Sequence, residues 1–286
     1  MKNKRMGAAL FGASGANCLV MSLALADGGL ELVAGLSVET VGVNRGQRSE
    51  DLNPAVTGFA EISKGRFYGG VVSTPTKILD EIRPLLLGYA GVKPNAFGMR
   101  FNVGARYYSF PDSSTFALDF DSDGVNDIEG DKGFAEVFAG AKRDIGKFTV
   151  GGSVFYTSNG FADSGDNYYG IVSLERSLGR GYKAKLHGAY TEAENDDFNQ
   201  DYGNFAIGVY KTFRGVDTFA RYSNTVGFDG PNNSVFVIGL EKSWSAVFGG
   251  EPDDGPLPPI HGRERRPNYD NLGRRRFLFD ISYERF

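Results

Sequence analysis

The chain has 286 residues, enough for one large β domain or two ordinary domains. Its formal net charge is −4, so a basic surface of the kind that binds nucleic acid is not indicated. Glycine is abundant at 40 residues, and the chain has 23 Phe and 14 Tyr. This combination suits β-structure with many tight turns better than helices. We therefore expect an all-β protein whose partners do not include nucleic acid.

Residues 1–26 have the layout of a secretory signal peptide. The uncharged, small and apolar stretch 7–25 ends at the A-x-A site Ala24–Ala26, and the residues before it are basic: Lys2, Lys4 and Arg5. A transmembrane anchor is the alternative, but Gly, Ala and Ser are frequent and a cleavage site follows. Cys18, the only cysteine, lies in this segment. The mature chain is thus expected to have no disulfide and no Cys-based zinc site.

The rest of the chain alternates apolar and polar residues with a period of two, as strands with one apolar face do. Leu32, Leu36 and Val38 belong to the first such row, and Phe236, Ile238 and Leu240 to the last. About twelve strands of roughly ten residues are predicted. They lie near 30–42, 54–63, 66–74, 81–92, 97–109, 133–143, 147–157, 167–177, 181–191, 202–213, 216–225 and 233–244.

Two details favour a transmembrane barrel over a soluble sandwich. Aromatic residues cap several apolar rows, as a girdle at a bilayer interface would: Tyr107, Tyr156, Phe213 and Trp244. The connections also alternate between short ones and longer, polar ones at 43–53, 75–80, 110–132, 158–166, 192–201 and 226–232. We expect the longer loops to be solvated and extracellular. The predicted fold is an up-and-down antiparallel transmembrane β-barrel of about 12 strands in the outer membrane of a Gram-negative bacterium.

The barrel is predicted to occupy 27–244, and residues 245–286 follow as a Pro-, Gly- and charge-rich linker and a C-terminal segment. Residues 274–286 end in an aromatic row of their own. They form either a periplasmic extension or the true closing strand, in which case one of the twelve segments is miscounted. The extension is slightly preferred.

The stretch from Gly35 to Thr74 resembles the opening of the TorF-type porins. The shared features are an R-G-x-x-S loop at 45–49, Pro54-Ala55-Val56, a Gly-Phe strand and a Phe-Tyr-x-Gly strand at 67–70. The middle is also similar, with Arg106-Tyr107-Tyr108 and an F-A-E-V strand around Glu136. The resemblance covers about 30–244, although the acidic loop and the tail depart from it. It implies an outer-membrane porin and brings no catalytic residues.

Charged residues on the polar face are candidates for the lining of the barrel interior. They carry both signs: Glu39, Arg83, Arg100, Arg106, Glu136, Lys183, Lys185, His187 and Arg221. In an open pore they would set electrostatic barriers for solutes. Alternatively, they pair with each other and fill a narrow barrel. Arg83, Arg100 and Arg106 are on neighbouring strands, so a positive strip favouring anions is a further expectation.

The function predicted is passive diffusion of small hydrophilic solutes, with a non-conducting, structural or partner-binding barrel as the alternative. An enzyme is not expected. His261 lies in the linker and His187 on the polar face, where a lipid substrate is out of reach, and nearby Ser173 and Ser177 are generic. Expected partners are outer-membrane lipid, lipopolysaccharide, the barrel-assembly machinery and the solutes.

Residues 119–131 read DFDSDGVNDIEGD and resemble a calcium loop. Their spacing matches calcium-loop positions 1, 3, 5, 7 and 9, with a backbone carbonyl at the fourth of these: Asp119, Asp121, Asp123, Val125 and Asp127. Position 12, however, is Gly130 where a bidentate Glu is usual. A solvated acidic loop is the equal alternative. No cofactor is required, and Ca²⁺ is the one candidate.

Overall fold

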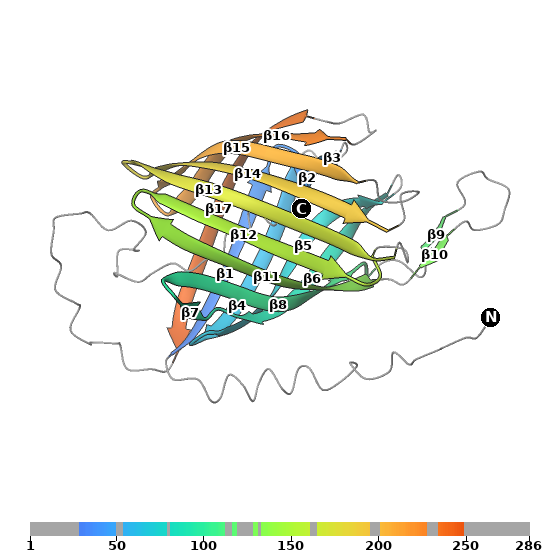
Figure 1. The fold of residues 1–286 in the computed structure, drawn as a ribbon, viewed down its shortest axis with the longest axis horizontal. Helices are drawn as coiled ribbons and strands as arrows, with labels where there is room; N and C mark the ends of the chain where they lie inside the picture. The colour runs from blue at the N-terminus through green and yellow to red at the C-terminus, as the bar shows by residue number, and fades with distance from the viewer. Residues whose placement is uncertain are drawn as a thin grey trace.

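The structure is a computed structural model that describes residues 29–49, 54–78, 81–111, 116–118, 128–130, 133–160, 165–194, 201–227 and 234–248. In these ranges the chain is built from strands, and twelve of them form one closed antiparallel barrel (Figure 1). Among the described residues, none forms a helix long and apolar enough to cross a membrane. The predicted fold class, an all-β barrel of twelve antiparallel strands, is confirmed.

Each barrel strand matches one of the twelve predicted segments. In chain order they are β1 (Leu30–Glu39), β4 (Ala55–Lys64), β5 (Phe67–Ile78), β6 (Glu81–Val92), β8 (Met99–Ser109), β11 (Gly133–Ile145), β12 (Phe148–Thr157), β13 (Asn167–Gly179), β14 (Tyr182–Ala193), β15 (Tyr202–Phe213), β16 (Val216–Val226) and β17 (Ser234–Phe248). Five short strands lie in connections: β2 (Gly42–Asn44), β3 (Gln47–Ser49), β7 (Asn95–Ala96), β9 (Phe116–Leu118) and β10 (Ile128–Gly130).

The first and last barrel strands close the sheet on itself. β1 pairs with β17 from Leu30 opposite Phe248 to Glu39 opposite Gly239, and on its other side β1 pairs with β4. β17 is therefore the closing strand, and it runs four residues past the predicted end at 244. Residues 274–286, the alternative closing segment, lie outside the described residues.

Connections of different length gather at the two ends of the barrel. The short turns, such as 146–147 and 214–215, share one end with the start of β1 and the end of β17. The connection expected at 75–80 is an exception to the predicted alternation, because β5 and β6 leave only 79–80 between them. Pro75 lies opposite Pro84 in that ladder, so neither proline ends its strand.

The two faces of the barrel wall have opposite polarity. Outward positions carry exposed apolar side chains, such as Val154, Val172 and Phe236, each more than 60% exposed. Inward positions are buried and include charged side chains, such as Glu136 and Arg221. Exposed aromatic residues mark both ends of the outer face: Tyr107, Tyr168 and Tyr190 toward the long connections, and Phe213, Trp244 and Phe248 toward the short turns.

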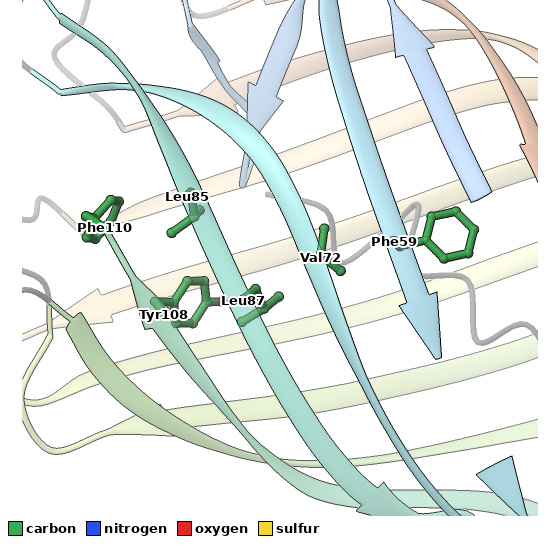
Figure 2. Packing of buried hydrophobic residues seen from close by; sticks show 6 residues of the cluster. All are labelled: Phe59, Val72, Leu85, Leu87, Tyr108 and Phe110. Carbon is green, nitrogen blue, oxygen red and sulfur yellow. The ribbon is translucent and has the colours of Figure 1, made fainter. Parts of the chain in front are cut away.

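Apolar side chains cover part of the inner wall as well. Six buried residues from four neighbouring strands form one cluster, which we call the apolar wall: Phe59, Val72, Leu85, Leu87, Tyr108 and Phe110 (Figure 2). Five of its members lie on β4, β5, β6 and β8, and the sixth, Phe110, directly follows β8. One sector of the interior is therefore apolar, in contrast to the charged sectors described below.

Glycines on the inner face lie directly opposite aromatic residues of the next strand. Phe219 on β16 is paired with Gly239 on β17, and a Cβ added at Gly239 would meet its ring at 2.2 Å. The same pairing and crowding recur at four other positions: Gly35 with Phe59, Gly70 with Tyr89, Gly91 with Tyr68 and Gly104 with Phe138. Each aromatic ring covers its glycine. In curved sheets, such a ring offsets the loss of stability that a glycine causes in a strand.

These pairs give a testable prediction on stability. Gly239→Ala should lower the free energy of unfolding by about 1–3 kcal/mol, because the new methyl overpacks against the ring of Phe219. Gly188→Ala is the matched control, since nothing lies within 4 Å of a Cβ added there. Thermal unfolding of both variants, followed by circular dichroism, would measure the difference. Equal midpoints for the two variants would contradict the proposed ring–glycine contact.

Candidate functional site

The candidate site lies inside the barrel, at the end where the long connections emerge. There the chain between β1 and β4 forms the small hairpin β2–β3, which we call the 42–49 hairpin. Its two turn residues, Arg45 and Gly46, have φ values of 43° and 86°. Two successive positive φ values are what a tight I′ hairpin turn requires, and glycine supplies one of them without strain.

The base of the 42–49 hairpin is fixed to the wall near β17. The backbone N–H of Thr40 donates to the carbonyl of Ile238 at 2.9 Å, and the N–H of Ile238 donates to Oγ1 of Thr40 at 3.1 Å. Val41 is buried in a cluster with side chains of three strands, against which Val43 also packs: Tyr210, Phe219, Val235 and Val237. The hairpin therefore leaves the wall along the inside of the barrel.

The tip of the hairpin is held by an ion triad, which consists of Arg45, Glu136 and Arg106. Nη2 of Arg45 lies 2.6 Å from Oε2 of Glu136, and Nε of Arg106 lies 2.5 Å from its Oε1. The Arg45 guanidinium also stacks 4.6 Å from the ring centroid of Tyr169, and that of Arg106 4.3 Å from the ring of Phe155. Such charge-assisted bonds on aromatic faces are stronger than neutral hydrogen bonds.

Arg45 of the triad remains a cation despite its burial. Burial alone would lower the pKa of the Arg45 guanidinium, but the carboxylate of Glu136 outweighs it and raises that pKa above its ordinary value. Glu136 is only 2% exposed, so it is a buried carboxylate that needs its two partners. The triad therefore has two positive charges and one negative charge, a net charge of +1.

The hairpin crosses the barrel from one side to the other. In the sheet order, β11 is five strands from β1 in one direction, and β13 is five strands away in the other direction. Arg45 contacts Glu136 on β11 and Tyr169 on β13, so its tip reaches the wall opposite β1. On the way, a Cβ added at Gly46 would lie 2.6 Å from Cβ of Asn204 on β15.

The expectation that the loop at 43–53 is solvated is thus wrong for its first part. Gly46 is buried, and the side chain of Arg45 is 18% exposed. The physical reason is the carboxylate of Glu136 on the far wall, which offers a partner that solvent-facing loop residues do not have. Residues 50–53 lie outside the described part of the chain.

Further ion pairs line the wall below the hairpin. Nζ of Lys93 lies 3.0 Å from Oε1 of Glu61 and 3.8 Å from the ring centroid of Tyr68. Burial lowers the pKa of the Lys93 ammonium, and Glu61 opposes that shift. Oε1 of Glu175 lies 3.3 Å from Nζ of Lys183, and Oε2 of Glu175 lies 3.7 Å from Nζ of Lys185. These pairs stand near the short-turn end, where they add to the charge of the interior.

One more pair joins the walls next to the hairpin. Nη2 of Arg221 lies 3.3 Å from Oε2 of Glu39. In the register, Arg221 and Lys185 flank Gly208 on the strand between them, so two cations border a position without a side chain. Counting the inward ion pairs described so far, six cations face four carboxylates, an excess of two positive charges.

The structure places the residues predicted to line the interior at different depths. Five of them are buried: Arg106, Glu136, Lys185, His187 and Arg221. Glu39 and Lys183 are partly buried, at 13% and 25% side-chain exposure. Arg100 is 36% exposed and pairs at 3.0 Å with the exposed Asp144 at the short-turn end. The side chain of Arg83 lies outside the described residues.

The expected positive strip of Arg83, Arg100 and Arg106 is not formed by the two residues whose side chains are described. Arg100 and Arg106 are six residues apart on β8, which corresponds to about 20 Å along a strand. Arg106 belongs to the ion triad near the long connections, whereas Arg100 belongs to the opposite end. Two residues on the same face of a strand are therefore not neighbours unless they also lie at a similar depth along the barrel axis.

Sequence reasoning missed two charged residues because they lie in connections. Arg45 is in the 42–49 hairpin, and Lys93 is in the turn after β6. The only signal for Arg45 was the Arg-Gly dipeptide, which is typical of a tight turn but does not indicate where the turn points.

The predicted calcium ligands all lie outside the described residues: Asp119, Asp121, Asp123, Val125 and Asp127. The backbone on both sides of them forms a short ladder, in which Leu118 of β9 pairs with Ile128 of β10. The acidic stretch therefore connects two paired strands, β9 and β10. In the described ranges, no group of three or more His, Cys, Asp or Glu residues is placed to hold a metal ion.

Comparisons with protein-family models and with curated proteins gave no match. The resemblance to TorF-type porins thus stays a prediction. Among solved structures, the KdgM porin is 6% identical over 75% of this chain and 99% of its own, with a TM-score of 0.49. The COG4313 outer membrane channel from Pseudomonas putida F1 is 11% identical over 78% of this chain and 97% of its own, with a TM-score of 0.45. The NanC porin is 7% identical over 76% of this chain and 98% of its own, with a TM-score of 0.42. These values are too low to carry an argument about function.

The acidic stretch 119–127 gives a second prediction. Millimolar Ca²⁺ should raise the melting temperature of the purified barrel by about 2–4 °C, because a ligand that binds only the folded state stabilises it. The double variant Asp121→Ala, Asp123→Ala should lose this shift, since it removes two of the oxygen ligands. Mg²⁺ at the same concentration is the control for ionic strength. A parent protein without any calcium-dependent shift would refute the site.

Proposed function

We propose that this protein is an outer-membrane β-barrel that allows passive diffusion of small hydrophilic solutes. The observation that carries the proposal is the inverted polarity of a closed barrel, apolar outside and charged inside. In lipid every backbone N–H and C=O must be paired within the protein, and a closed barrel meets that demand because it has no edge strand. Barrel strands of 10 to 15 residues are long enough to span a bilayer at a tilt.

The outer face supports the membrane part of the proposal. Its exposed apolar band has aromatic residues at both ends, the arrangement of a girdle at each interface. We further propose that lipid and lipopolysaccharide surround this band in a Gram-negative outer membrane, and that the barrel-assembly machinery inserts it. The motifs shared with TorF-type porins support the same assignment.

The inner face supports the transport part. Four carboxylates and six cations form the inward ion pairs described above, and charges of both signs attract and repel passing solutes. A specific observation also favours the alternative, a non-conducting barrel: the apolar wall and the 42–49 hairpin occupy part of the interior. Conductance decides between the two functions.

The third prediction concerns conduction itself. Purified, folded protein should produce discrete single-channel steps in planar bilayers, and proteoliposomes that contain it should swell in small sugars or amino acids but not in large polysaccharides. Heat-modifiable migration on gels would verify the fold of each preparation. A folded barrel with neither conductance nor swelling would refute the channel and leave the structural barrel.

The fourth prediction concerns the bilayer. Val172→Arg should disfavour membrane insertion by about 2–4 kcal/mol, because Val172 lies on the outer face near the middle of β13. Phe97→Arg is the matched control, since Phe97 is 92% exposed but lies in the turn region between β7 and β8. Folding yield into lipid vesicles would compare the two variants. Equal yields would contradict a lipid-facing outer wall.

A further inference from the structure

We infer that the 42–49 hairpin is the selectivity element of this barrel, with Arg45 as the residue that sets both the width and the ion preference of the passage. This inference rests on the proposed channel function. In this arrangement the hairpin is a strut across the interior, and the ion triad of Arg45, Glu136 and Arg106 is the latch that holds its tip.

Among the described residues, the position of the strut near the barrel mouth makes it an obstacle for a solute that enters from the long-connection end. Glu136 lies three residues from the long-connection end of β11, and Arg106 three residues from that of β8. The base of the hairpin is packed by Val41, and its tip reaches the far wall. A solute must therefore pass beside the hairpin, whose position determines the width of the mouth.

The charge of the latch gives the mouth an ion preference. Two guanidiniums and one carboxylate leave a net charge of +1, and the three groups are largely buried. Buried charges are screened less by salt than exposed ones, so the excess acts on ions in the passage. The excess cation near Glu175 adds to it from the other end. The passage is expected to favour small anions over small cations.

Two neutral variants separate the width of the passage from its charge. Arg45→Gln and Glu136→Gln both break the ion pair that holds the tip. Arg45→Gln leaves one guanidinium and one carboxylate, whereas Glu136→Gln leaves two guanidiniums. If the hairpin is the selectivity element, both variants raise conductance, but their ion preferences change in opposite directions.

Reversal potentials across a KCl gradient and single-channel conductance test this inference. The parent should prefer Cl⁻; Arg45→Gln should move the reversal potential toward K⁺, and Glu136→Gln should move it further toward Cl⁻. Conductance should rise roughly twofold or more in both variants. Reversal potentials that move in opposite directions in the two variants would support the inference. A merely structural role of the hairpin would move the reversal potentials of both variants in the same direction. Reversal potentials equal to that of the parent in both variants would overturn it.

A disulfide lock tests the strut without depending on the charges. Cys18 is the only cysteine of the chain, and it belongs to the predicted signal peptide, so Gly46→Cys with Asn204→Cys would introduce an isolated pair. A Cβ at Gly46 would lie 2.6 Å from Cβ of Asn204, so a small shift reaches the separation of about 3.5–4.5 Å that a disulfide needs.

The lock is most informative in the Arg45→Gln background. Oxidation should return conductance to the parental value, because the tip is held again, while the reversal potential stays changed, because the cation is still missing. Reduction should raise conductance once more. In protein whose two thiols have cross-linked, a conductance that does not respond to oxidation and reduction would overturn the inference.

The same experiments distinguish failure of the inference from failure of the proposed function. A parent and variants that fold but never conduct would refute the channel itself. A parent that conducts, with Arg45→Gln, Glu136→Gln and locked variants that all behave like it, would leave the channel intact and refute only the role of the 42–49 hairpin.

Discussion

The pairing of β1 with β17 is the constraint on which the rest of the structure depends. It turns a twelve-stranded sheet into a barrel in which every long strand has two neighbours. Without it, two edge strands would present unpaired N–H and C=O groups, which cost several kcal/mol each where no water can reach them. Closure also separates the two faces of every strand into an inside and an outside. The period-two pattern of the sequence thus becomes an apolar exterior and a polar interior.

Ring–glycine pairs connect the unusual composition to the candidate site. A ring that lies over a glycine stays close to the wall, as Phe138 does over Gly104. Phe138, Phe155 and Tyr169 then form a continuous aromatic surface, with centroids 5.8 and 5.7 Å apart. The guanidiniums of the ion triad stack on this surface. The glycine and aromatic residues therefore shape the interior and also provide the faces that position its cations.

The strands could be predicted from the sequence because each of them is specified locally. Alternation of side chains identifies a strand and its faces, and all twelve segments were found at nearly their observed bounds. The inward course of the 42–49 hairpin could not be predicted in this way. It depends on contacts of Arg45 with Glu136 and Tyr169, which are 91 and 124 positions away along the chain. The separation of Arg100 from Arg106, which were expected to share a strip, has a related cause: the face of a strand does not specify depth along the barrel axis.

The 42–49 hairpin stands between two unlike sectors of the interior. The apolar wall covers β4, β5, β6 and β8, whereas the buried side chains of β14, β15 and β16 include Lys185, Asn204 and Arg221. Gly46 of the hairpin packs against the polar sector, at Asn204 and Thr225. A glycine allows this contact because any side chain there would collide with the wall. The hairpin therefore lies closer to the polar sector, and its arginine adds a second guanidinium to the charges that β8 and β11 bring to the mouth.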